Sequence, residues 1–133
     1  MIDKSVFEYS WINEIRNDKP ILLIAEGLLM YFKEKEVKEL IDKLMETFTK
    51  GEMLLEVTTP IVVEKNREHN NSFQRNAPFQ WGIKSGKELE NYNPKIKFVK
   101  EWNYFDHHLD RRKEANLTLR REFSGRIVHL EIG

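Results

Sequence analysis

The residues that could most readily do chemistry are Glu26 and Gly27, which directly follow the apolar run ILLIA at residues 21–25. Apolar residues resume at Leu28, so this carboxylate stands at the edge of what reads as a buried strand. A charge in such a place is costly unless something pairs with it. Two roles fit Glu26: it caps the helix that follows, whose N-terminus favours an anion, or it binds a cationic group of a ligand.

Tyr31 lies a short distance after Glu26 and also has two readings. Its hydroxyl lines a substrate pocket, or its ring packs against the sheet with the hydroxyl at the surface. Further along, His107, His108 and Asp110 form a group that could bind a metal ion. Adjacent histidines on a strand point to opposite faces, and no third ligand has a diagnostic spacing. We therefore expect no metal site there, but a surface loop or a contact of His107 with substrate.

Aromatic residues gather in the second half of the chain and either line a pocket for a flat substrate or pack in the core, which is their commoner fate. They are Phe79, Trp81, Trp102, Tyr104 and Phe105. Several arginines flank acidic residues and are expected on a solvated face. They are Arg111, Arg112, Arg120 and Arg121.

Length and composition limit the function classes. The chain has 133 residues, which fits one domain over residues 1–133, and its 22 basic residues balance 22 acidic ones, so charge gives no argument for nucleic acid or an anionic membrane. The absence of cysteine excludes disulfides and thiolate nucleophiles. No apolar run reaches the roughly 20 residues that a membrane-spanning helix needs. The first residues lack a signal-peptide pattern, so we expect a cytoplasmic location.

The elements that must position these residues read as a strand–helix–strand unit. Residues 5–16 favour a short amphipathic helix, and residues 21–25 favour a strand covered on both sides. Residues 34–48 place apolar side chains at helical spacing. Residues 52–60 form a second buried strand, which Pro60 stops. Strands joined by a helix of this length are parallel with a right-handed crossover.

The second half of the chain predicts a helix over residues 61–70 and a short helix capped by Ser85. Two further strands, at residues 95–105 and 123–132, lack a crossover helix between them and are expected to pair antiparallel at the sheet edge. The predicted fold class is therefore α/β, with two parallel strands, a final antiparallel strand pair, and helices on both faces. Ligands bind outside the carboxyl ends of parallel strands. Glu26 lies at such an end, as do Thr58 and Thr59.

These residues resemble a known family. The segment ILLIAEGLLMYF, followed by an acidic amphipathic helix, resembles the AEG-x-x-x-Y segment of the leucine carboxyl methyltransferase superfamily, which includes the tetracenomycin-polyketide type of O-methyltransferases. Other segments resemble the same family in the same order, so that the resemblance covers nearly the whole chain. They are SVFEYSWINEI, APFQWGI, ELENYNP, EWNYFDHH and RIVHLEIG.

The resemblance implies a class I, Rossmann-like methyltransferase fold that uses S-adenosylmethionine, with this chain supplying strands four to seven of a seven-stranded sheet. Glu26 and Gly27 match positions at the methionine end of the cofactor. The resemblance places three further residues near the adenine, namely Ser5, Val6 and Phe7. The residues expected to contact the methyl acceptor are Tyr31, Trp81, Trp102 and His107.

The family's first half carries a glycine-rich turn, because close backbone approach to a cofactor needs glycine. No G-x-G motif occurs in this chain. We therefore expect the carboxyl-terminal half of an O-methyltransferase that acts on a carboxylate or hydroxyl of a small, polyketide-like acceptor and is inactive alone. Methyl transfer to a carboxylate needs positioning more than acid–base catalysis, so no catalytic residue is assigned.

A non-enzymatic hypothesis remains beside this one. Without a preceding strand, the edge of residues 21–25 is apolar and unpaired, which invites another chain. The chain would then be an oligomerising or partner-binding remnant, and its partner a separate amino-terminal half or a second copy. A dinucleotide-dependent oxidoreductase is disfavoured, because it needs the same absent glycine turn.

Overall fold

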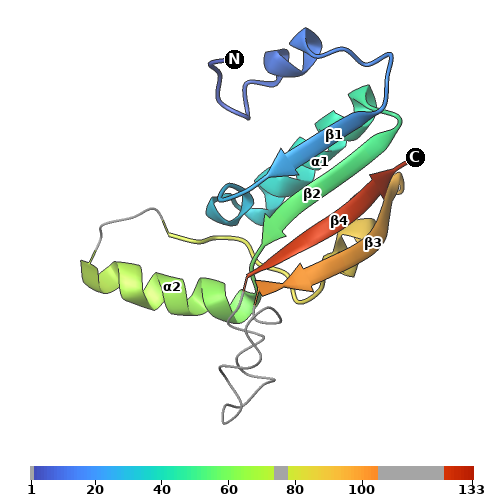
Figure 1. Cartoon of the computed structure of the whole chain (residues 1–133). Coiled ribbons are helices and arrows are strands. Elements are labelled where there is room, and N and C mark those ends of the chain that lie inside the picture. The colour runs from blue at the N-terminus through green and yellow to red at the C-terminus, as the bar shows by residue number, and fades with distance from the viewer. Residues whose placement is uncertain (1, 74–77, 105–124) are drawn as a thin grey trace.

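The computed structural model describes residues 2–73, 78–104 and 125–133. In this part of the chain, four strands form one mixed sheet in the order β1-β2-β4-β3. Figure 1 shows the sheet with α1 behind it and α2 below it. The predictions for Phe105, for the group of His107, His108 and Asp110, and for the arginines between 111 and 121 lie outside the described residues.

The strands lie close to their expected positions. They are β1 (Ile21–Ala25), β2 (Gly51–Val57), β3 (Ile96–Asn103) and β4 (Arg126–Ile132). β1 pairs parallel with β2, whereas β4 runs antiparallel between β2 and β3. The prediction of two parallel strands and an antiparallel pair is therefore confirmed.

The helices also follow the sequence pattern. They are η1 (Tyr9–Glu14), η2 (Leu29–Tyr31), α1 (Glu34–Thr47), α2 (Pro60–Phe73) and η3 (Gly86–Asn91), where η marks a 3-10 helix. The helix expected within residues 5–16 is only this short 3-10 turn, because Ile15 is already extended. No helix in the described ranges has both the length and the apolarity to cross a membrane.

The core lies on one face of the sheet. Helix α1 directs its apolar stripe at the sheet, as a period of 3.6 requires; its buried residues are Val37, Leu40, Ile41, Leu44 and Met45. Alternate residues of β2 and β4 meet this stripe, as a period of two requires; they are Met53, Leu55, Val57, Val128, Leu130 and Ile132. Residues of η3 pack on the same face, where Gly86 lies against Val128.

The opposite face of β1 is open, which corrects the expectation of cover on both sides. Leu22 is 58% exposed and Ile24 is 66% exposed, although both are large and apolar. The physical reason is that, among the described helices, α1 packs on the other face of the sheet and leaves these two side chains exposed. In addition, β2 is the one described strand that neighbours β1. In the described sheet β1 is also the outermost strand, so its apolar side chains lie beside an edge that no described strand pairs with.

Candidate cofactor and substrate site

Three strand ends and one strand start meet at one edge of the sheet. The carboxyl ends of β1, β2 and β3 reach this edge, and antiparallel β4 begins there. The end of β3 and the start of β4 are joined by a hydrogen bond from the Tyr104 N–H to the Gly125 carbonyl at 3.0 Å. Since ligands of open α/β sheets bind at the carboxyl ends of the strands, this edge is the place to look for a site.

Glu26 lies at this edge and does not cap a helix. The 3-10 helix η2 follows Leu28, which makes no side-chain cap hydrogen bond. Helix α1 is capped from within, because the Lys33 N–H donates to Glu36 Oε1 at 2.9 Å. The capping role that the sequence left open is therefore wrong. Glu26 is exposed and, within the described ranges, has no hydrogen-bond or ion-pair partner.

Glu56 ties the loop after β1 to the rest of the sheet. Its Oε1 accepts a hydrogen bond from the Gly27 N–H at 2.6 Å, and its Oε2 accepts one from the Tyr104 hydroxyl at 3.0 Å. Gly27 has a φ of 62°, a conformation that favours glycine. Glu56 was not among the site residues expected from the sequence. The signal was available, since Glu56 is a second charge set within a buried strand.

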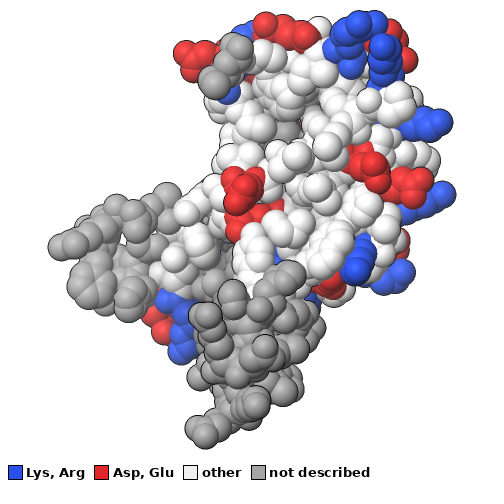
Figure 2. Space-filling model, viewed as in Figure 1, with Lys and Arg blue, Asp and Glu red and all other residues white. Residues whose placement is uncertain are grey.

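Tyr104 is held as a neutral phenol. Burial, the hydrogen bond to Glu56 and the charges of Glu56 and Glu26 together raise the pKa of Tyr104 to about 12. Near neutral pH the Tyr104 hydroxyl is therefore a hydrogen-bond donor to Glu56. We call Glu26, Glu56 and Tyr104 the acidic cluster. Figure 2 shows acidic side chains together near the end of β1, surrounded by uncharged surface.

The segment predicted to pass the adenine does reach the carboxyl end of β1. Val6 and Ala25 both line a small apolar cavity of about 100 Å³. The rings of Phe7 and Phe32 lie 4.5 Å apart between centroids. Ser5 is exposed, and its hydroxyl accepts a hydrogen bond from the Phe7 N–H at 3.3 Å. The structure thus brings Val6 to the strand end that Glu26 follows, while the contact of Ser5, Val6 and Phe7 with adenine stays a prediction.

Of the residues expected at the methyl acceptor, Tyr31 and Trp81 lie on neighbouring segments, since the Trp81 N–H donates to the Met30 carbonyl at 3.2 Å, whereas Trp102 lies on β3. The ring of Tyr31 packs edge-on against Phe79, with ring centroids 5.2 Å apart, and the residue is 36% exposed. This geometry favours packing at the surface over contact with substrate. Trp81 is 2% exposed and donates from Nε1 to the Tyr92 hydroxyl at 2.9 Å. A buried, satisfied indole is a core residue, so this geometry favours packing over substrate contact for Trp81.

Trp102 faces the open side of the sheet. Its ring stacks on His129 with centroids 6.4 Å apart. His129 in turn contacts Glu52, with Nε2 and Oε1 2.8 Å apart. His107 lies outside the described residues. Across the ranges that the structure describes, no three histidine, aspartate or glutamate side chains come together as metal ligands would.

Thr58 and Thr59 lie at the carboxyl end of β2, as expected. They are 4% and 3% exposed. Thr58 accepts a hydrogen bond from the Ile83 N–H at 2.8 Å, and the Thr59 carbonyl accepts one from Val63 at 3.1 Å in the first turn of α2. The chain around residue 83 is thereby fixed beside the end of β2.

The arrangement of strands and helices is that of a Rossmann-like fold shared with SAM-dependent methyltransferases. A DUF574 family protein from Streptomyces avermitilis covers 99% of this chain with a TM-score of 0.68 and 10% identity. A SAM-dependent methyltransferase from Anabaena variabilis covers 96% with a TM-score of 0.52 and 12% identity. Magnesium protoporphyrin IX methyltransferase from Synechocystis, solved with bound SAH, covers 84% with a TM-score of 0.50 and 10% identity.

Among proteins of known function, the chain is similar to the tetracenomycin polyketide synthesis O-methyltransferase TcmP of Streptomyces glaucescens. The two are 26% identical over 106 residues, which are 80% of this chain and 39% of that protein. No protein-family model matches. The resemblance inferred from the sequence motifs is therefore confirmed. The chain spans 54%, 54% and 44% of the three solved structures, and thus about half or less of every protein compared.

Proposed function

We propose that this chain is the carboxyl-terminal half of an S-adenosylmethionine-dependent O-methyltransferase whose acceptor is a carboxylate or hydroxyl of a small, polyketide-like molecule. The observation that carries the proposal is Glu26, an exposed carboxylate without a hydrogen-bond partner in the described part of the chain, at the carboxyl end of β1. The fold shared with methyltransferases and the named activity of the Streptomyces glaucescens protein support it.

The acidic cluster suits the charge of this cofactor. S-adenosylmethionine carries an ammonium and a sulfonium, and a carboxylate–ammonium hydrogen bond contributes roughly 1.5–3 kcal/mol. Glu26 would hold the ammonium, and Glu56 would orient the loop that presents Glu26 by its bond to Gly27. When bound, the cofactor supplies a methyl group that passes to an acceptor oxygen as the carbon–sulfur bond breaks. The paired rings of Phe7 and Phe32 would exclude water beside it.

The cofactor site in this chain is one half of a site. A nucleotide held at a strand end needs a glycine-rich turn for close backbone approach, and this chain contains no G-x-G. Calorimetric titration of the chain with S-adenosylmethionine is therefore expected to show no binding in the micromolar range. Micromolar binding by the chain alone would contradict the half-site.

Complementation supplies the positive test. The chain is produced together with a glycine-rich amino-terminal half, taken from the DNA that precedes its coding sequence or from the Streptomyces glaucescens protein. We expect the two parts to copurify and to bind S-adenosylhomocysteine in the micromolar range. A folded, copurified complex that does not bind it would contradict the methyltransferase proposal.

A second candidate function, partner binding, is favoured by the exposed edge of β1. Leu22 and Ile24 are exposed apolar side chains on a strand with one neighbour. An unpaired apolar edge is a template for another strand. The occupant we propose is the same glycine-rich half, whose strands would extend the sheet beyond β1 and cover this face.

Light scattering after size exclusion separates the alternatives for this edge. We expect the chain alone to self-associate as its concentration rises, and the variant I24K to reduce both self-association and copurification with the other half. The matched control is V99K, which places the same charge on the exposed Val99 of β3. If the chain stays monomeric at every concentration and Ile24→Lys does not change copurification, the edge of β1 is not a binding surface.

A further inference from the structure

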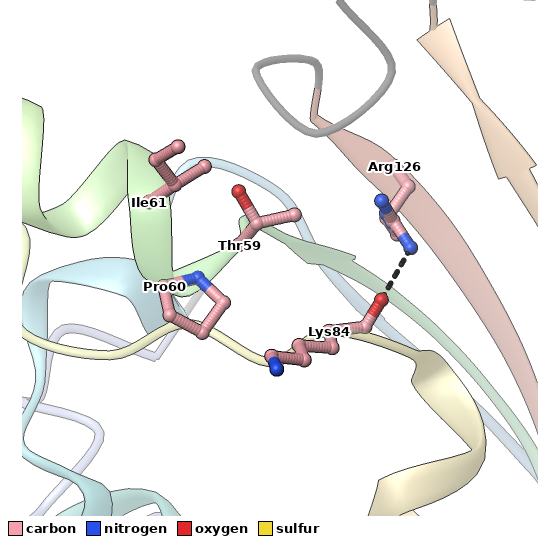
Figure 3. Close-up of a pocket in the computed structure, with 5 residues that line it drawn as sticks. All are labelled: Thr59, Pro60, Ile61, Lys84 and Arg126. Carbon is pink, nitrogen blue, oxygen red and sulfur yellow. Dashed lines mark hydrogen bonds between the residues drawn. The ribbon is translucent and has the colours of Figure 1, made fainter. Parts of the chain in front are cut away.

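A pocket of about 270 Å³ opens between the first turn of α2 and the start of β4 (Figure 3). Its described lining consists of Thr59, Pro60, Ile61, Lys84 and Arg126. These residues come from three separated parts of the chain, and all lie at the sheet edge where β2 ends and β4 begins. We call it the cationic pocket.

The walls of the cationic pocket are fixed by backbone contacts. The Ile83 N–H donates to the Thr58 carbonyl at 2.8 Å, which aligns the chain before Lys84 with the end of β2. From the other side, Arg126 Nη1 donates to the Lys84 carbonyl at 2.8 Å, as Figure 3 shows. At Gly82 the two backbone segments lie so close that a Cβ would be 2.6 Å from the Thr59 carbonyl. The shape of the pocket is therefore set before any ligand arrives.

The pocket has more positive than negative charge. Arg126 has a side chain only 12% exposed, and its Nη1 lies 3.2 Å from Glu101 Oε2. Its Nε is buried and has no hydrogen-bond partner in the described chain. Lys84 is exposed and forms no ion pair with any described residue. Glu101 thus balances Arg126, and Lys84 is left as the exposed cation of the pocket lining.

The first turn of α2 adds to the same preference. The helix begins at Pro60, which has no N–H to satisfy, so Ile61 presents the first free amide of the helix. The N-terminal end of a helix favours negative charge. Pro60 and Ile61 also give the pocket apolar walls, which suit a ring better than a small inorganic anion.

We propose that the cationic pocket binds the carboxylate of an aromatic carboxylic acid and so anchors the methyl acceptor. That the bound acid is the methyl acceptor rests on the proposed function, whereas the binding of an aromatic carboxylate does not. The pocket and the acidic cluster share one sheet edge, because Glu56 and Thr59 lie at the same end of β2. A substrate anchored by Lys84 and Arg126 would therefore lie at the same end of the sheet as the proposed cofactor site, where β2 ends and β4 begins.

The test is an NMR titration of the whole chain with 2-naphthoate, following backbone amides and the arginine Nε–H. We expect saturable shifts at Ile61, Lys84 and Arg126 Nε. The neutral analogue 2-naphthamide is expected to bind at least about tenfold more weakly, because a charged hydrogen bond is lost. Inorganic phosphate is expected to bind more weakly than 2-naphthoate. Equal binding of the amide, or tighter binding of phosphate, would overturn the assignment to an aromatic carboxylate.

Variants locate the site and keep the result separate from folding. The variant K84Q, at an exposed side chain, is expected to weaken 2-naphthoate binding at least about tenfold. Its matched control is K97Q, which removes the same charge from an exposed position on β3 and is expected to bind as the parent does. Equal losses in both variants would mean that general charge attraction, not this pocket, holds the ligand.

Failure of the proposed function can be told from failure of this inference. Binding of S-adenosylhomocysteine to the complemented protein reports on the completed cofactor site and not on the cationic pocket. If that binding is absent while Lys84-dependent 2-naphthoate binding persists, the methyltransferase proposal is wrong and the carboxylate pocket stands. If S-adenosylhomocysteine binds and 2-naphthoate does not, the pocket assignment is wrong and the methyltransferase proposal stands.

Discussion

The acidic cluster and the cationic pocket occupy the same edge of the sheet but are built differently. The acidic cluster depends on one side chain, Glu56, which bridges the loop after β1 and the hydroxyl after β3. The cationic pocket depends on backbone contacts, with Lys84 held between the ends of β2 and β4. Opposite charges on one edge suit a transfer from a cationic donor to an anionic acceptor.

The difference extends to how complete each region is. The described lining of the cationic pocket comes from α2, the segment before η3, and β4. The acidic cluster lies next to β1, whose outer edge pairs with no other described strand and whose open face exposes Leu22 and Ile24. We infer that the acceptor side of the proposed active site can be tested in this chain by itself, whereas the donor side needs the other half.

The largest effect expected is from a methyl group added at the wall of the cationic pocket. In G82A the new Cβ would lie 2.6 Å from the Thr59 backbone, which must shift. Overpacking of this kind costs about 1–3 kcal/mol. Urea denaturation should show that loss, and 2-naphthoate binding should disappear, while Tyr104 keeps its raised pKa.

The matched change on the other region is G125A. Here the added Cβ would lie 3.1 Å from the ring of Tyr104, a contact that the ring can relieve by a small movement. We expect a stability loss of less than about 1 kcal/mol and a changed Tyr104 titration. If G125A proves more destabilising than G82A, the contrast between a rigid pocket and an adaptable cluster is wrong.

Removal of the bridging carboxylate should weaken the acidic cluster next. E56L leaves the Gly27 N–H and the Tyr104 hydroxyl without their acceptor, and we expect a loss of about 1–2 kcal/mol in the free energy of unfolding. The control is E52L on the same strand, where Glu52 contacts His129 and touches neither Gly27 nor Tyr104. Equal losses in the two variants would show that Glu56 has no special role.

The titration of Tyr104 gives a smaller, specific signal. Its pKa is raised from 10.0 to about 12, so folding favours the neutral phenol. The stabilisation is complete below pH 10 and is lost as the pH rises through 12, because only the folded state resists ionisation. In an ultraviolet absorbance titration, the tyrosine that ionises at the highest pH should be absent in Y104F. In E56Q the same ionisation should occur at lower pH. An unchanged titration in E56Q would remove Glu56 as a cause.

The smallest effect expected is on the stability of K84Q. Lys84 is exposed and has no ion pair within the described ranges, so its free energy of unfolding should change by less than about 0.5 kcal/mol. Urea denaturation checks this directly. A larger loss would mean that Lys84 supports the fold, and its effect on ligand binding would then need the Arg126→Lys variant as a second measure.

Sequence reasoning reached those features that depend on local pattern. The period of apolar residues predicted α1, and the apolar run ending at Glu26 predicted β1 and its exposed carboxylate. The alternation of Val128, Leu130 and Ile132 predicted β4. Each follows from which residues share a face of one element.

The features that the sequence did not reveal depend on register and on contacts between distant residues. Glu56 lies 29 positions from Gly27, and Arg126 lies 42 positions from Lys84. Such pairs follow only once the strand order and alignment are known. The open face of β1 was also missed, because an apolar strand looks the same whether a helix of its own chain or another part of a larger fold covers it.

The most direct test of the central claim is calorimetric titration of the complemented protein with S-adenosylhomocysteine, comparing the parent with E26Q. We expect Glu26→Gln to weaken binding roughly tenfold to a hundredfold, because a charge-assisted hydrogen bond to the ammonium is lost. The control E46Q removes a carboxylate from the exposed surface of α1, and its dissociation constant should equal that of the parent. A dissociation constant unchanged by Glu26→Gln would contradict the assignment of this edge to the cofactor.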